Sequence, residues 1–193
     1  MAEIALFHSV LGVRPGVHDA ARRLRAAGNE VLVVDQYDGR VFDDYEEAGR
    51  HVDAVGFPAL TDRALEAVTP LRDGFVVAGF SNGAGMAEHV ATQRVCGGAL
   101  LFSGALPLDL LGGVRWRGET PAQIHYAQVD PFRRQEWIDA LVGDITRSGA
   151  AVEVFDYAGR GHLFTDASLP AEHDPLAAAT LWERAEAFCR DVS

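Results

Sequence analysis

The chain has 193 residues, of which 48% are hydrophobic and 23% are charged, so it is long enough for one domain with a sizeable core. Its formal net charge of -11 disfavours binding to nucleic-acid backbones and to anionic membrane surfaces. No segment reaches the roughly 18 apolar residues of a membrane span, and the first residues lack the pattern of a signal peptide. We therefore expect a single cytoplasmic domain that spans residues 1–193.

Short apolar runs alternate along the chain with longer segments that have helical periodicity. The apolar runs predict strands at residues 4–7, 31–34, 74–80, 98–102, 124–129 and 152–157. The periodic segments predict helices at residues 16–27, 60–68, 82–94, 136–148 and 175–192. Two further stretches, one polar and acidic and one rich in glycine and proline, predict long surface loops at residues 36–51 and 104–120.

This alternation is typical of an α/β fold in which a mostly parallel sheet of about six to seven strands has helices on both faces. Because parallel strands end at the same edge of such a sheet, functional side chains are expected just past the carboxyl ends of the strands. The two cysteines, Cys96 and Cys189, match no metal-binding spacing, and we expect both to be reduced and buried. The sequence predicts neither a metal ion nor a cofactor.

Residues 79–83, with the sequence GFSNG, match the pattern G-x-S-x-G where a predicted strand runs into a predicted helix. A tight turn of this kind leaves room only for glycine two residues before and after the serine, and it projects the hydroxyl of Ser81 at the sheet edge. The N-terminus of the following helix favours the negative charge that develops during attack. The glycines form neither G-x-G-x-x-G nor a P-loop, which disfavours a nucleotide site. Ser81 is therefore the predicted nucleophile.

A serine hydroxyl needs a base, and in this arrangement the base follows the nucleophile and the acid along the chain. His162 comes after the last predicted strand in the segment YAGRGH, whose two glycines allow the loop to bring the imidazole back over the sheet edge. His125 lies inside a predicted strand, and His173 lies in a polar loop near the last helix. We predict that His162 is the base.

The base needs an acid that orients the imidazole and stabilises the imidazolium formed during attack. Asp130 is the predicted acid, because it directly follows the strand at residues 124–129. Asp156 is the alternative, but it lies inside the last predicted strand. An Asp-Pro pair also begins ordinary turns, so the assignment of Asp130 depends on its place between Ser81 and His162.

Acyl transfer also needs backbone N–H groups that hold the oxyanion of the tetrahedral intermediate. One is expected from Asn82, the residue after the nucleophile. The other is expected from residues 8–12, which follow the first predicted strand, and position alone does not decide which residue supplies it.

Together these segments resemble the dienelactone hydrolase family, whose members have the α/β-hydrolase fold. Residues 8–12 (HSVLG) resemble the family's His-Glu-x-x-Gly segment, and residues 31–39 (VLVVDQYDG) resemble its strand that ends in Asp-Leu-Tyr. Residues 79–83 correspond to the nucleophile turn, and residues 161–164 (GHLF) to the segment of the catalytic histidine. The resemblance covers nearly the whole chain. It implies that Val10 supplies the second oxyanion N–H and that no large lid domain is present.

The chain departs from the founding enzymes of that family at three positions. They have a cysteine nucleophile where this chain has Ser81, a glutamate where it has Ser9, and an arginine where it has Asp166. The glutamate and the arginine belong to a charge network that gates the thiolate and binds the substrate carboxylate. Their joint absence indicates a serine branch of the family, and a carboxylated dienelactone is not the expected substrate.

The sequence therefore predicts a serine hydrolase that cleaves a small ester or lactone through an acyl-enzyme, as a monomer or a weak homodimer. Phe80, Tyr37 and Trp116 lie beside a catalytic position, after a strand end or in a long loop. Each is a candidate substrate contact and also a candidate packing residue. Two alternative functions remain, an acyltransferase that uses the same triad and a binding protein that has the hydrolase scaffold without its activity.

Overall fold

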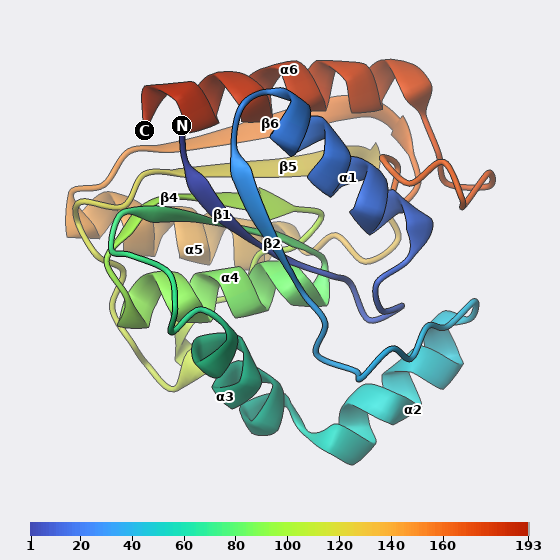
Figure 1. The fold of residues 1–193 in the computed structure, drawn as a ribbon, viewed down its shortest axis with the longest axis horizontal. Coiled ribbons are helices and arrows are strands. Elements are labelled where there is room, and N and C mark those ends of the chain that lie inside the picture. The colour runs from blue at the N-terminus through green and yellow to red at the C-terminus, as the bar shows by residue number, and fades with distance from the viewer. Residues whose placement is uncertain (193) are drawn as a thin grey trace.

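The computed structural model describes residues 1–192, and Figure 1 shows their arrangement. Six strands form one sheet: β1 (Glu3–Phe7), β2 (Glu30–Val34), β3 (Phe75–Phe80), β4 (Cys96–Phe102), β5 (Ala122–Val129) and β6 (Val152–Arg160). The helices of the described residues are α1 (Pro15–Ala26), α2 (Tyr45–Val55), α3 (Phe57–Ala67), α4 (Asn82–Gln93), α5 (Gln135–Ser148) and α6 (Pro175–Asp191). A short 3-10 helix, η1 (Leu108–Leu111), lies between β4 and β5.

The sheet has the strand order β2-β1-β3-β4-β5-β6, and every neighbouring pair is parallel. The chain therefore winds in one direction from β1 to β2 and in the other direction from β3 to β6. In open α/β sheets, a crevice forms where the winding direction reverses, just beyond the carboxyl ends of the strands. Here the reversal lies between β1 and β3, so the segments that follow Phe7 and Phe80 meet at that crevice.

The helices cover both faces of the sheet, with α1 and α6 on one face and α3, α4 and α5 on the other (Figure 1). The residues of β1 alternate between these two layers. Ala5 and Phe7 pack on the side of α3, α4 and α5, whereas Ile4 and Leu6 pack on the side of α1 and α6. Because both faces of the strand are buried from Ile4 to Phe7, these residues are all apolar instead of alternating with polar ones.

The predicted fold class is confirmed, since the sheet has six strands, all parallel, with helices on both faces. Each strand and helix predicted from the sequence is present, with bounds that differ by a few residues. Both cysteines are buried, as expected. Within residues 1–192, no helix combines the length and the apolar character that a membrane span needs.

The prediction of one long loop at residues 36–51 is wrong in its second half, where α2 begins at Tyr45. Asp44 caps this helix, because its carboxylate accepts a hydrogen bond from the Glu47 N–H at 2.8 Å. Acidic side chains in the first turn also interact favourably with the helix dipole. The same acidic residues made the segment resemble a surface loop, since only Ala48 of this helix is fully buried.

His125 is a buried histidine in β5, between the rings of Phe102 and Phe155 at centroid distances of 5.5 and 5.2 Å. Its Nδ1 is 2.8 Å from the Tyr157 hydroxyl. Burial, together with the nearby Arg184 guanidinium, lowers the pKa of His125 to about 3. The folded chain therefore holds a neutral imidazole, whereas a histidine in the unfolded chain has a pKa of about 6.5.

We expect the free energy of unfolding to fall as the pH drops below about 6.5, because the unfolded chain then binds a proton that the folded chain does not. Between about pH 7.5 and about pH 5, His125 alone accounts for about 2 kcal/mol of this loss. Urea unfolding at both pH values measures the effect. Between these two pH values, the free energy of unfolding should fall less in His125→Phe than in the wild type. In His18→Gln, which changes an exposed histidine, it should fall as much as in the wild type. Equal losses in the wild type and His125→Phe would contradict the assignment.

Candidate active site

Ser81 lies between β3, which ends at Phe80, and α4, which begins at Asn82. Its backbone has φ 54° and ψ −115°, a conformation that residues other than glycine rarely adopt. The Ser81 N–H donates to the Phe102 carbonyl at 2.7 Å, and the Ser81 carbonyl accepts from the Ala84 N–H at 2.9 Å. These bonds hold a sharp turn between strand and helix, at the carboxyl end of the central strand.

Close backbone contacts require the two glycines of the motif. A Cβ atom on Gly79 would collide with the Gly83 carbonyl, and one on Gly83 would collide with the His8 carbonyl. These neighbours are backbone atoms, which cannot move aside as a flexible side chain can. The pattern G-x-S-x-G thus has a steric cause here: the turn, the helix and the loop after β1 approach one another too closely for side chains.

Ser81, His162 and Asp130 form one hydrogen-bonded row. The Nε2 of His162 is 2.6 Å from the Ser81 Oγ, and its Nδ1 is 2.8 Å from the Asp130 Oδ2. Because an ionised carboxylate only accepts hydrogen bonds, Nδ1 carries the proton and Nε2 accepts from the serine hydroxyl. His162 is 3% exposed and Asp130 is 7% exposed, so little water competes for these bonds. This arrangement can remove the proton of the serine hydroxyl during attack.

Neighbouring groups fix the Asp130 carboxylate and the His162 imidazole in these orientations. The Oδ1 of Asp130 accepts a hydrogen bond from the Phe132 N–H at 2.8 Å, which leaves Oδ2 for the imidazole. The His162 carbonyl accepts from the Ser103 hydroxyl at 2.6 Å. The Phe132 ring lies 4.7 Å from the imidazole, edge to face. Rotation of the histidine side chain is therefore restricted from several sides.

The alternative residues that the sequence left open lie elsewhere. His125 is buried in β5. The Nδ1 of His173 is 3.0 Å from a backbone carbonyl of the loop that contains His173. Asp156 pairs with Arg133 and is half-exposed in β6. Among the described residues, the row at Ser81 is the one in which an imidazole meets both a hydroxyl and a carboxylate.

Glu172 is a part of this site that the sequence did not indicate. It belongs to the histidine loop (residues 161–174), and its Oε2 accepts from the N–H groups of His162 at 2.9 Å and Leu163 at 2.7 Å. Its Oε1 accepts from the Tyr45 hydroxyl at 2.8 Å. Burial and this carboxylate raise the pKa of Tyr45, so its hydroxyl stays protonated as a donor. One carboxylate thus joins the backbone beside the imidazole to α2.

We expect Glu172→Ala to lower kcat about 10- to 100-fold with a much smaller change in KM, because a displaced imidazole slows the chemical step. Glu172→Gln should keep most of the activity, since the amide oxygen can accept both N–H groups and the amide nitrogen can donate to the Tyr45 oxygen. Steady-state kinetics of the two variants, with thermal unfolding as the folding control, test this. A glutamine variant as slow as the alanine variant would show that the charge, not the position, matters.

His8 holds the loop that follows β1. Its Nε2 accepts from the Gln36 N–H at 3.1 Å, so its Nδ1 carries the proton and donates to the Ser9 carbonyl at 2.6 Å. Burial lowers the pKa of His8, which favours this neutral form. Within residues 1–192, the N–H groups of Val10 and Asn82 have no hydrogen-bond partner. They remain the predicted oxyanion donors.

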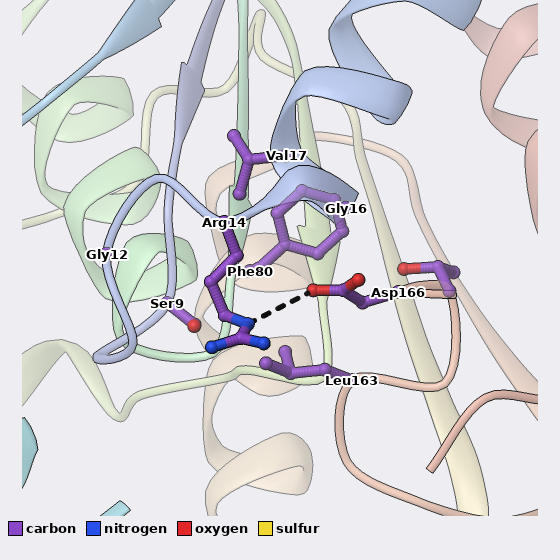
Figure 2. A pocket seen from close by; sticks show the side chains of 9 residues that line it. Ser9, Gly12, Arg14, Gly16, Val17, Phe80, Leu163 and Asp166 are labelled. Atoms are coloured by element: carbon purple, nitrogen blue, oxygen red, sulfur yellow. Dashed lines mark ion pairs between the residues drawn. The ribbon is translucent and has the colours of Figure 1, made fainter. Parts of the chain in front are cut away.

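Figure 2 shows the region in which the chain departs from the founding members of the family it resembles. Arg14 lies between Ser9 and Asp166, and its Nε is 3.8 Å from the Asp166 Oδ2. The same guanidinium donates to the Asp43 carboxylate at 2.6 Å and to the Phe42 carbonyl at 2.7 Å. Arg14 is buried, and the two carboxylates neutralise its charge. The contact between Arg14 and Asp166 connects the loop after β1 to the histidine loop.

A hollow of about 250 Å³ borders Ser81, Asn82 and His162. Its walls come from the starts of α3 and α5 and from the segments that follow β4 and β5. The hollow is open to solvent on one side and is large enough for a small organic group. A second hollow, of about 510 Å³, borders the other side of His162 without reaching Ser81.

None of the three predicted substrate contacts lines the hollow beside the serine. Phe80 is buried and packs against Phe102 at a ring distance of 4.9 Å. Tyr37 is buried with its ring 4.5 Å from that of His8. Trp116 is buried in the core beside α5, where its Nε1–H donates to a backbone carbonyl at 2.7 Å. The packing alternative is the one that this structure supports for all three.

A family model described as "Dienelactone hydrolase family" matches residues 2–193. The comparison with curated proteins finds no match. The fold is similar to that of a dienelactone hydrolase-like promiscuous phosphotriesterase from metagenomic libraries, with TM-score 0.84, 19% identity, and 100% of this chain and 87% of that chain covered. It is similar to Thermogutta terrifontis esterase 2 phosphonylated by cyclosarin, with TM-score 0.70, 18% identity and coverage of 100% and 83%. It is also similar to a protein named m3DLH, with TM-score 0.82, 23% identity and coverage of 99% and 86%.

Proposed function

The chain belongs to the dienelactone hydrolase family and is an ester hydrolase, and from that premise we propose that it cleaves small carboxylic esters or lactones through an acyl-enzyme on Ser81. The observation that carries the proposal is the row of hydrogen bonds from Ser81 Oγ through His162 to Asp130, at 2.6 and 2.8 Å. A nucleophile, a base and an orienting acid in this geometry constitute the means of acyl transfer.

In the first half-reaction, the Ser81 Oγ forms a bond to the carbonyl carbon as its proton passes to His162 Nε2. The Asn82 and Val10 N–H groups hold the oxyanion, and Asp130 stabilises the imidazolium. The bond between the carbonyl carbon and the alkoxy oxygen then breaks, and the proton moves from Nε2 to that oxygen. The alcohol leaves, or stays attached to the acyl group when the substrate is a lactone.

In the second half-reaction, water gives a proton to His162 Nε2 and attacks the acyl carbon. The bond to Ser81 Oγ breaks, the proton returns to that oxygen, and the carboxylic acid is released. No step needs a redox partner. The neutralised Arg14 and the carboxylate of Asp166 argue against the carboxylated dienelactone of the founding enzymes, because a second carboxylate beside Asp166 would be repelled.

The test is a series of p-nitrophenyl esters and small lactones under single-turnover and steady-state conditions. We expect an initial burst of p-nitrophenolate equal in amount to the enzyme, followed by a slower steady rate, because the acyl-enzyme accumulates. Turnover without any burst, together with no mass increase of the trapped enzyme, would argue against a covalent intermediate that accumulates.

The same experiment separates the two alternatives. An acyltransferase would release the acyl group much faster when an alcohol or amine acceptor is added, whereas a hydrolase would not. A binding protein without activity would show neither burst nor turnover. The phosphonylated Thermogutta esterase also suggests a probe: we expect a fluorophosphonate to label this chain on Ser81, identified by peptide mass spectrometry.

A further inference from the structure

We propose that the substrate carries an uncharged, apolar acyl group that is larger than acetyl, held in the hollow beside Ser81. This inference rests on the proposed function and names the acyl class that it would accept. It is carried by the lining of the hollow, by the absence of a cation among those lining residues, and by a second hollow that borders His162 without Ser81.

The walls of the hollow are mostly aromatic or aliphatic. The side chains that give it this character are Phe57, Leu106, Tyr126, Phe132 and Trp137. Among the described lining residues there is no lysine, arginine, aspartate or glutamate. Transfer of a carboxylate from water to such a surface is costly without a paired cation, whereas an apolar group gains from burial.

Leu106 is held in place from two directions. Its N–H donates to both carboxyl oxygens of Glu88, at 3.1 and 3.2 Å, and its side chain lies so close to Gly85 that a Cβ there would be only 2.6 Å from a Leu106 methyl. Glu88 is completely buried, and burial raises its pKa well above the ordinary value. A protonated carboxyl offers no positive charge to an anionic acyl group, and an ionised one would repel it.

The position of Ser81 assigns the two hollows to the two halves of an ester. The acyl carbon must bond to Ser81 Oγ, and the smaller hollow is the one that borders Ser81 and Asn82. The leaving oxygen is bonded to that carbon when it receives its proton from His162 Nε2, so it also lies beside Ser81. The larger hollow borders His162 without Ser81, and it can hold the outer part of the alcohol. Phe132 borders both hollows and lies between the two halves.

The volume sets a minimum useful size for the acyl group. A hollow of about 250 Å³ has room for an aromatic ring. A benzyl group attached to the carbonyl fits this space and suits an aromatic lining. A methyl group leaves most of the lining uncovered.

The test varies the acyl group with the leaving group kept as p-nitrophenol. We expect kcat/KM for the phenylacetate to exceed that for the acetate at least ten-fold, because contacts in an apolar pocket discriminate by about this factor or more. We expect the monosuccinate, which carries a carboxylate, to be turned over at least ten-fold more slowly than the pentanoate, a neutral ester of similar length.

Two variants of Leu106 should move this preference in opposite directions. Leu106→Phe narrows the hollow and should lower kcat/KM for the phenylacetate at least ten-fold, with less than a three-fold change for the acetate. Leu106→Ala widens it and should raise kcat/KM for the larger 1-naphthylacetate relative to the phenylacetate. Leu176→Phe is the matched control, because it makes the same change at a residue of α6 that is 81% exposed and lines neither hollow. It should leave the acyl preference unchanged.

Three outcomes would overturn the inference. They are equal kcat/KM values across the neutral acyl groups, a monosuccinate rate equal to that of the pentanoate, and Leu106 variants that change the preference among alcohols and not among acyl groups. Each of them leaves the burst and the labelling of Ser81 unaffected, so the acyl assignment can fail while the proposed function stands. Loss of burst and labelling in the wild type would instead remove the proposed function itself.

Discussion

Replacement of Ser81 by alanine should lower kcat for ester hydrolysis by about 10⁶-fold, the loss typical of a serine nucleophile removed from a complete triad. The expected cause is the loss of the atom that bonds to the acyl carbon, since His162 and Asp130 stay in place without it. The residual rate would reflect substrate binding and the oxyanion donors. The measurement is single-turnover hydrolysis of a p-nitrophenyl ester by purified wild type and variant, with circular dichroism to compare the folds.

Ser103 provides the matched control. It follows β4, has a positive φ of 51° like that of Ser81, and borders the same hollow. Its hydroxyl, however, donates to the His162 carbonyl at 2.6 Å and does not meet a base. Ser103→Ala should therefore keep activity within about ten-fold of the wild type, because it removes one hydrogen bond of modest strength.

The fluorophosphonate probe gives a second reading of the same prediction. The wild type and Ser103→Ala should be labelled on Ser81, and Ser81→Ala should not be labelled. Ester turnover that is equal in the wild type and Ser81→Ala would rule out Ser81 as the nucleophile. Labelling that moves to Ser103 would show that the hollow is correct and the serine is not.

The sequence was sufficient to bring Ser81, Asp130 and His162 together because each follows a strand of a parallel sheet. The carboxyl ends of parallel strands lie at one edge of the sheet. Residues that directly follow different strands are therefore close together in space, even when they are far apart in the sequence. The two glycines of the turn were also predictable from the sequence. Their requirement is local and steric, which a short sequence pattern records directly.

The residues that orient this row were not predictable in the same way. Glu172 acts on backbone N–H groups, which every residue carries, so its partners leave no pattern in the sequence. Its contact with Tyr45 joins positions 127 residues apart, within a segment whose acidic composition resembled a loop. Local composition does not determine which distant backbone groups a carboxylate meets.

The residue types at single positions also did not indicate every charged contact in the folded chain. Ser9 and Asp166 predicted that the founding enzymes' charge network is absent, but they did not reveal that Arg14 lies between them in the folded chain. Phe80, Tyr37 and Trp116 illustrate the same limit, because aromatic residues near strand ends or in long loops serve packing as readily as binding. Apart from Ser81, Asn82 and His162, the residues that line the hollow come from segments that carry no motif.

Asp130→Asn should lower kcat by about 10⁴-fold with little change in the fold, because an amide in this position imposes the wrong tautomer on the base. The two oxygens of Asp130 accept from the Phe132 N–H and from His162 Nδ1, both at 2.8 Å. An asparagine can keep its oxygen toward only one of them. With the oxygen toward Phe132, its NH₂ group faces Nδ1, the proton shifts to Nε2, and the base can no longer accept from Ser81. With the oxygen toward Nδ1, two N–H donors face each other at Phe132.

Asp156→Asn is the matched control, since Asp156 is the other carboxylate that the sequence offered as the acid. Its partner is Arg133, whose side chain is 14% exposed, so its replacement removes a partly exposed ion pair that lies outside the row at Ser81. Its kcat should stay within a few-fold of the wild type. A large loss in Asp156→Asn with a small one in Asp130→Asn would reverse the assignment. Equal and large losses would instead mean that the ion pair with Arg133 supports the segment after β5, on which the position of Asp130 depends.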